Sequence, residues 1–228
     1  MAEPDPSLPV RERIAASAAA CLDDGTFVNV GIGIPGLVPH HTPDERGIVF
    51  HAEHGVVGFG SDRFGPDDGP VLRFFGSSYR LRPGAFIGDH TRSFALIRSG
   101  RLDVTILGAF EVEASGLMAN FQTVDMASGC PGGSPELAGG AKRVIVTLEH
   151  RAKDGQTRLV TTTRHPIGLP RPVDLVVTEL GVFRPAGDHF RVVRLAGGVD
   201  LAQVRAATGA RVEPAEPGEP GPEPGAEP

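Results

Sequence analysis

The sequence predicts an α/β protein built on a single open sheet, mixed or parallel, with helices flanking it. Segments rich in β-branched residues alternate with segments of helical periodicity along most of the 228 residues. Several predicted strands end at glycine-rich turns, among them Thr26–Val30 before Gly31 and Ile48–Phe50 before Gly55. A chain of this length suits one large domain or two small ones, and it buries about 70% of the surface that its unfolded form exposes.

The first predicted helix begins after Pro9, in a run of strong helix formers that places apolar side chains at helical spacing up to Leu22. After the strand Thr26–Val30, the sequence GIGIPG predicts a tight turn into a helix over about residues 35–41. This order presents free backbone N–H groups to an anion or a carbonyl oxygen. A turn of this kind without a third glycine or a P-loop lysine is no nucleotide fingerprint, and a purely structural turn is the alternative.

The segment Ile48–Gly60, IVFHAEHGVVGFG, places the carboxylate of Glu53 where a predicted strand ends and a glycine-rich turn begins. In open α/β sheets, ligands bind in the crevice beyond the carboxyl ends of the strands. Glu53 is therefore placed to meet a substrate. By residue type alone, a solvated loop glutamate is the alternative.

The later part of the chain continues the alternation. Strands are predicted at residues 71–75, 85–87, 104–107, 142–147, 157–162, 173–179, 182–184 and 190–195, and helices at about 90–99 and 200–208. Residues 61–69 and the pair Pro83-Gly84 are predicted to form a surface loop and a turn, respectively. Glu111 and Glu113 alternate with apolar residues, which predicts a half-exposed strand.

Composition divides the chain into a flexible leader at 1–8, one domain at 9–212 and a disordered Pro/Glu/Gly tail at 213–228. The net charge is −6, and the tail contributes five Glu residues and no Lys or Arg. The folded part is thus nearly neutral, so we expect no nucleic-acid partner. The two cysteines form no CxxC pair, and we expect neither a disulfide framework nor a metal site. No signal-peptide pattern or long apolar run occurs, which predicts a cytoplasmic protein without membrane spans.

Four collinear segments resemble the β subunits of the 3-oxoacid CoA-transferase family. HAEHGVVGFG resembles its SENGxxGxG active-site segment, and VNVGIGIPGL resembles its NLGIGIP segment. Residues 94–121 resemble its SFAMIRGGHxDVxxLGAxQVxxxGDLANW block, and AKRVIVTLEH at 141–150 resembles its AKxVVVTMEH. A fifth segment, the loop SGCPGGSPELAGG at 128–140, resembles the family's GMGGAMDLVSS loop, with Gly132 and Gly133 at the paired glycines. Together, the matches cover most of residues 26–183.

This resemblance implies a CoA-transferase (NagB/RpiA-like) fold and the transfer of CoA from a donor such as succinyl-CoA to a 3-oxo acid, acetoacetate or 3-oxoadipate. It makes Glu53 the nucleophile that forms a covalent glutamyl-CoA intermediate. The implied oxyanion or CoA-binding residues are Gly31, Gly33, Gly132 and Gly133. The implied supporting residues are Asn29, His51, His54 and Gly55. CoA is then a substrate, no cofactor is bound, and a separate α subunit completes a heterotetramer.

The chain departs from the family pattern at two places. His54 stands where the family has Asn, and the second glycine loop carries Pro131 in place of Met and Ser-Pro-Glu at 134–136 in place of Ala-Met-Asp. Two other functions therefore stay open. One is a CoA-ester or ring-opening hydrolase on the same fold, and the other is a non-catalytic, ligand-sensing partner subunit.

Overall fold

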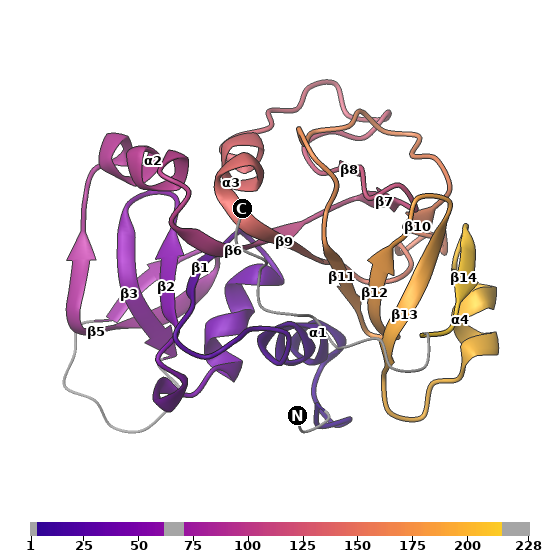
Figure 1. Ribbon diagram of the computed structural model, residues 1–228, viewed down its shortest axis with the longest axis horizontal. Coiled ribbons are helices and arrows are strands. Elements are labelled where there is room, and N and C mark those ends of the chain that lie inside the picture. Colours follow the sequence, from indigo (N-terminus) through magenta and orange to yellow (C-terminus); the bar gives the residue numbers. More distant parts are fainter. Residues whose placement is uncertain (1–3, 62–70, 216–228) are drawn as a thin grey trace.

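The structure is a computed structural model that describes residues 4–61 and 71–215. Within these ranges the chain forms an eleven-stranded mixed sheet (Figure 1). In spatial order, its strands are β14 (Arg211–Glu213), β13 (His189–Leu195), β12 (Gly181–Pro185), β11 (Leu175–Thr178), β9 (Ala141–Thr147), β6 (Leu102–Gly108), β1 (Phe27–Val30), β2 (Val49–Ala52), β3 (Val56–Ser61), β5 (Ser77–Ile87) and β4 (Val71–Phe74). The fold class predicted from the sequence is confirmed.

The five central strands β11, β9, β6, β1 and β2 run parallel to one another. The chain passes from β1 to β2 in one direction along the sheet and later from β6 through β9 to β11 in the other. Connections therefore diverge between β1 and β6, which is the topological switch point where open α/β sheets bind ligands. Antiparallel strands extend the sheet on both sides of this parallel centre.

Helices lie on both faces of the sheet. They are α1 (Val10–Ala19), the 3₁₀ helices η1 (Pro35–His41) and η2 (Asp44–Arg46), and the helices α2 (His90–Arg98), α3 (Ser134–Gly140) and α4 (Leu201–Ala207). α1 packs against η1, β9 and β11, whereas α2 and α3 contact each other at the upper edge of Figure 1. Among the described residues, every helix is too short or too polar to cross a membrane.

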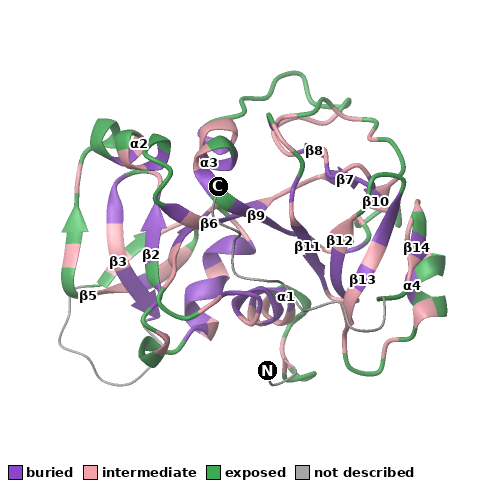
Figure 2. Cartoon of the chain, in the orientation of Figure 1, coloured by how far each residue is buried: buried purple, intermediate pink, exposed green. Residues whose placement is uncertain are grey.

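The apolar core consists of two clusters, one on each side of the sheet. The first includes Ile14 of α1 and Phe50 of β2, and the second includes Ile97 of α2 and Phe183 of β12. Figure 2 shows this distribution, with buried residues concentrated in the central strands and exposed residues on the outer faces of α2 and α4. Because the core stabilises the sheet from both faces, the strand ends are held in fixed positions.

A second, three-stranded sheet of β7 (Glu111–Glu113), β8 (Met118–Ala119) and β10 (Leu159–Val160) lies beside the main one. The strand predicted at 157–162 is this shorter β10. The prediction that Glu111 and Glu113 are half-exposed is wrong, because they are only 1% and 9% exposed. Glu111 accepts hydrogen bonds from the backbone and side chain of Arg164, which supplies the charge that burial of a carboxylate requires.

The prediction of a turn at Pro83-Gly84 is also wrong. β5 runs from Ser77 through Ile87, and the pairing with β3 shifts so that Val57 opposes Phe86 while Phe59 opposes Leu81. The Pro-Gly pair is thus accommodated as a bulge within one strand rather than as a reversal of the chain. The surface loop predicted at 61–69 lies mostly outside the described residues, as does the predicted tail beyond residue 215.

Candidate active site

A cavity of about 590 Å³ lies at the carboxyl ends of the central parallel strands. Its lining includes Gly31 directly after β1, Glu53 directly after β2, Gly108 at the end of β6 and Thr147 at the end of β9. This volume is within the range of small-molecule sites. The cavity therefore occupies the position that the strand order favours for a ligand.

Glu53 begins the tight turn between β2 and β3. Gly55 closes this turn, donating its N–H to the carbonyl of Ala52 (2.9 Å) and accepting from the N–H of Gly88 (2.8 Å). Gly55 has a φ of +110°, and a Cβ atom at this position would collide with the Gly88 carbonyl. Glycine is required here because both the backbone conformation and the close approach of Gly88 exclude a side chain. The turn thereby fixes Glu53 at the edge of the cavity.

The carboxylate of Glu53 lies against the backbone of Gly133. A Cβ atom placed on Gly133 would overlap Glu53 Oε2 and would lie 2.9 Å from Phe94 Cζ. Burial raises the pKa of Glu53 above its ordinary value, and the nearby His90 partly offsets this effect. Glu53 is thus a partly desolvated carboxylate that faces a cavity and touches a glycine backbone.

Both predicted glycine turns line the same cavity as Glu53. Gly31 donates its N–H to the Ile106 carbonyl (2.9 Å), so this N–H holds β1 against β6 and is not available to a ligand. Within the described residues, the N–H groups of Gly33, Gly132 and Gly133 have no backbone acceptor. These three N–H groups are thus left without a backbone partner in residues that line the cavity.

Asn29 and His51 belong to a buried chain of hydrogen bonds between neighbouring strands. Thr105 Oγ1 donates to Asn29 Oδ1 (3.0 Å), and Asn29 Nδ2 donates to His51 Nδ1 (3.1 Å). Since an amide nitrogen only donates, His51 Nδ1 is unprotonated and Nε2–H donates to Ser93 Oγ (2.9 Å). Burial, with a smaller effect of His54, lowers the pKa of His51 to about 4, so the ring is neutral at pH 7.

The buried chain connects β6, β1 and β2 to α2, which carries Ser93. His51 thus hydrogen-bonds to β1 and α2, and among the described residues it is not part of the cavity lining. His51 lies within β2, whereas Glu53 follows the last residue of that strand, Ala52, and lines the cavity. His54 is exposed, and its ring meets those of Phe74 and Phe75 edge-on, with centroids 4.8 and 5.5 Å away.

Several cavity residues have no signal in the sequence. They come from α1, from the segments before α3 and from the turn after β9, and are Arg11, Asn120, Cys130, Glu149, Lys153 and Arg158. Apart from Cys130, which belongs to the second glycine-rich loop, none of them lies in a glycine-rich turn, and only the folded sheet brings them to the cavity that Glu53 lines. His90, which stacks on Phe94 with ring centroids 4.6 Å apart, is likewise recognisable only from the structure.

Comparison with known proteins identifies relatives along most of the chain. Residues 11–207 match the family model of Coenzyme A transferase. The β subunit of a probable coenzyme A transferase of Bacillus subtilis is 37% identical over 204 residues, which cover 89% of this chain and 94% of the relative. The β subunit of the acetate CoA-transferase of Escherichia coli is 36% identical (89% and 93% covered), and the B subunit of the 3-oxoadipate CoA-transferase of Acinetobacter baylyi is 32% identical (88% and 93%).

Solved structures share the fold at lower identity. An acyl-CoA transferase of Escherichia coli O157:H7, YdiF, superposes with a TM-score of 0.68 at 20% identity; the match covers 92% of this chain and 43% of that one. The decarboxylase AibA/AibB superposes with a TM-score of 0.61 at 22% identity over 90% of this chain and 86% of its own. The family model matches most of this chain, and the three relatives are more than 30% identical to it over nearly their whole length. The chain therefore belongs to the coenzyme A transferase family, among the members named as β or B subunits.

Proposed function

We propose that this chain is the catalytic β subunit of an enzyme that moves CoA from an acyl-CoA to a free carboxylic acid, with Glu53 as the nucleophile. The observation that supports this function most strongly is the contact of the Glu53 carboxylate with Gly133 inside a cavity bordered by both glycine turns. A side-chain carboxylate in this position offers covalent catalysis, which divides one difficult exchange into easier steps.

The proposed reaction begins when a Glu53 oxygen attacks the thioester carbonyl of the acyl-CoA. The C–S bond breaks, leaving an acyl-glutamyl anhydride and CoA thiolate. The thiolate then attacks the glutamyl carbonyl, releases the first acid as a carboxylate and leaves CoA joined to Glu53 as a thioester. The acceptor acid repeats these steps in reverse, which regenerates the Glu53 carboxylate and gives ping-pong kinetics.

Each attack passes through a tetrahedral oxyanion that needs hydrogen-bond donors. The N–H groups of Gly33, Gly132 and Gly133, which lack backbone acceptors among the described residues, are the candidate donors. A preorganised donor of this kind is worth on the order of 3 kcal/mol in the transition state. Partial burial of Glu53 supports the same role, because a carboxylate with fewer water contacts has less hydration to lose before it attacks.

The proposed donor is an acyl-CoA such as succinyl-CoA, and the proposed acceptor is a 3-oxo acid such as acetoacetate or 3-oxoadipate. The relative from Acinetobacter baylyi is named for 3-oxoadipate, and the relative from Escherichia coli is named for acetate. A cavity of about 590 Å³ accommodates the reacting part of any of these substrates. CoA takes part as a substrate, and we propose a cytoplasmic enzyme.

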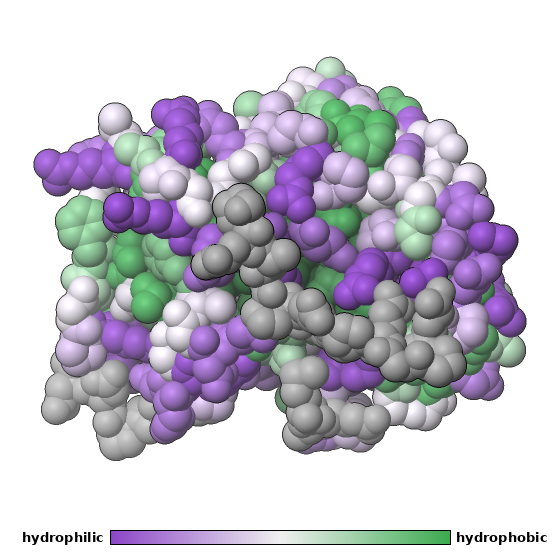
Figure 3. Space-filling view, viewed as in Figure 1, coloured by the Kyte–Doolittle hydropathy of each residue, from purple (hydrophilic) through white to green (hydrophobic). Residues whose placement is uncertain are grey.

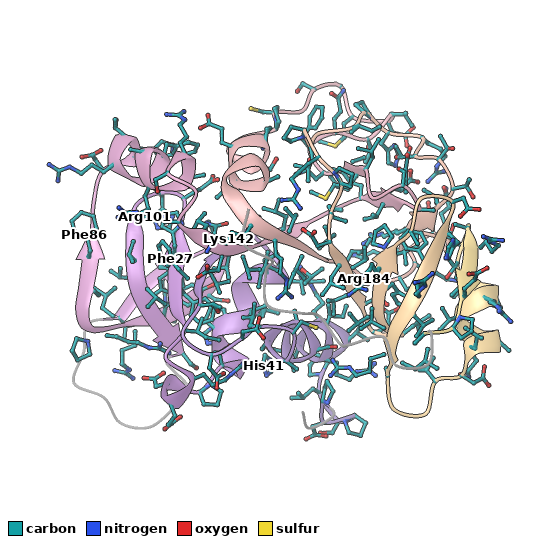
Figure 4. The ribbon with its side chains drawn as sticks, viewed as in Figure 1. Phe27, His41, Phe86, Arg101, Lys142 and Arg184 are labelled. Atoms are coloured by element: carbon teal, nitrogen blue, oxygen red, sulfur yellow. The ribbon has the colours of Figure 1, made fainter. Side chains whose placement is uncertain are left out.

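We further propose that a separate α subunit covers part of this chain, in a heterotetramer. The relatives are named as β or B subunits. Hydrophobic residues also lie exposed on the outer strands, where Phe86 is 48% and Ile87 61% exposed. Figure 3 shows hydrophobic surface over β3 and β5, and Figure 4 shows Phe86 at the outer margin of the sheet. Exposed apolar surface of this kind is typical of subunit contacts.

The proposal is tested on the complex of this chain with its α subunit, supplied with acetoacetyl-CoA or succinyl-CoA and a carboxylic acid. A transferase forms a new acyl-CoA from the added acid, whereas a hydrolase forms only free CoA at a rate that the acid does not change. We expect Glu53→Gln to abolish transfer, while Glu45→Gln, which removes an exposed carboxylate from η2, leaves it intact. Full transfer by Glu53→Gln would instead favour a non-catalytic role for this chain.

A further inference from the structure

Three positively charged side chains line the Glu53 cavity without an acidic partner among the described residues. Arg11 belongs to α1, Lys153 lies in the turn after β9, and Arg158 directly precedes β10. No carboxylate in the described part of the chain lies within ion-pair distance of any of the three. Other arginines of this chain are neutralised by the fold, as Arg143 is by Asp23 (3.1 Å). Structural ion pairing within residues 4–61 and 71–215 therefore does not explain the three cavity cations.

Each of these side chains starts from a backbone that the fold fixes. The Arg11 guanidinium comes within 3.4 Å of the Cβ position of Gly33, so it overhangs the first glycine turn. The backbone N–H of Arg158 donates to the His150 carbonyl (3.1 Å), and the backbone carbonyl of Arg158 accepts from the N–H of Val112 (2.8 Å). Lys153 sits in a turn closed by a bond from the Ala152 N–H to the Gln156 carbonyl (2.8 Å). Arg11 on a helix and Arg158 beside a strand are therefore suited to binding a ligand at a defined place, whereas Lys153 is exposed in its turn.

The charge balance of the cavity favours an anionic ligand. Against the three cations the lining supplies two carboxylates, Glu53 and Glu149, in a chain whose overall charge is −6. A nucleophilic carboxylate repels substrates that are themselves anionic, and cations beside it offset this repulsion. Guanidinium groups also match carboxylate and phosphate geometry through paired N–H donors.

We propose that Arg11, Lys153 and Arg158 form an anion-binding subsite that holds a charged group of the substrate away from the reacting carbonyl. This inference rests on the proposed CoA transfer. Two substrate groups have the required chemistry: the second carboxylate of a dicarboxylic acid and a phosphate of CoA. In the first case, the subsite selects dicarboxylic acids over monocarboxylic ones, and in the second, it holds the donor in place during both half-reactions.

The test compares Arg158→Gln and Arg11→Gln with the wild-type complex. Arg101→Gln is the matched control, because Arg101 is an exposed cation just before the amino end of β6, whereas the cavity lies at the carboxyl ends of the central strands. Transfer is measured as the incorporation of isotopically labelled acetate or succinate, the acceptors, into a thioester. The donors are acetyl-CoA and S-acetylpantetheine, which lacks the phosphates. Loss of one charge-assisted hydrogen bond is expected to lower kcat/KM roughly tenfold or more.

A loss that is at least roughly tenfold larger for succinate than for acetate assigns the subsite to the second carboxylate. A loss that is equal for both acids, but absent with S-acetylpantetheine, assigns it to a CoA phosphate. Losses independent of both substrates, or no larger than that of Arg101→Gln, overturn the inference while leaving the proposed function standing. If the wild-type complex transfers no CoA, the proposed function fails. Equilibrium binding of CoA and of succinate then decides the subsite, and affinities unchanged in Arg158→Gln refute it.

Discussion

Replacing Gly133 with alanine tests the contact between the Glu53 carboxylate and the second glycine turn. Gly133 has φ −84° and ψ −4°, a conformation open to alanine, so the backbone of the variant is unstrained. The new methyl group would overlap Glu53 Oε2 and approach Phe94 Cζ to 2.9 Å. Because the carboxylate is the end of a flexible side chain, it moves away by roughly 1 Å, and a misplacement of that size costs roughly 100-fold in rate.

The stability of Gly133→Ala should change far less than its activity, since overpacking of a side-chain terminus costs about 1–3 kcal/mol. Gly139→Ala is the control within the same helix, because its Cβ meets nothing closer than Pro170 Cγ at 4.0 Å. We expect this control to keep wild-type activity and to gain up to about 1 kcal/mol of stability from the better helix former. Steady-state transfer assays and thermal unfolding of both variants give the two quantities. Wild-type kcat/KM in Gly133→Ala would refute the placement of Glu53 against this turn.

Three further predictions follow from the burial of titratable groups. Burial raises the pKa of Glu53, so the ionised carboxylate destabilises the folded state once the pH exceeds the pKa of an unperturbed Glu. Glu53→Gln should therefore unfold at a higher temperature than wild type, by a margin that grows from acidic to neutral pH. A margin that shrinks over this range would contradict the prediction. Burial lowers the pKa of His51 and of His150 from 6.5 to about 4. Between these two pH values each ring is neutral in the folded protein and binds a proton on unfolding, so about 3 kcal/mol of stability per ring should be lost as the pH falls from 6.5 to about 4. His51→Gln should weaken the pH dependence of the free energy of unfolding, measured by chemical denaturation at several pH values. A variant with the pH dependence of the wild type would contradict this role of the His51 ring. Finally, a thiol reagent should label the exposed Cys130, which lines the cavity, and spare the buried Cys21. Peptide mapping that finds Cys130 unlabelled in the folded protein would contradict an open cavity at this position.

Local sequence patterns predicted the elements that hold Glu53. The strand before it, the glycine turn after β1 and the first helix follow from β-branched residues, glycine spacing and helix formers close together in the chain. The position of Glu53 at the carboxyl end of a parallel strand follows from the same patterns together with the general rule for ligand sites in α/β sheets. The resemblance of four segments to one family then identified Glu53 as the candidate nucleophile.

Features that depend on distant partners could not be predicted. Burial of Glu111 requires Arg164, which lies more than fifty residues later and whose side chain reaches it only in the folded chain. The Pro83-Gly84 pair has the local character of a turn, but pairing of β5 with β3 on both sides of it keeps the strand continuous. The cationic lining of the cavity likewise depends on three segments that the sheet topology alone brings together.

The central claim is that Glu53 forms a covalent bond to CoA during each turnover. The complex with the α subunit should be incubated with succinyl-CoA in the absence of an acceptor acid, digested and analysed by mass spectrometry. We expect the peptide containing Glu53 to gain the mass expected of a CoA thioester and to lose it when acetoacetate is added. Active transfer with this peptide recovered only in its unmodified form would contradict the account.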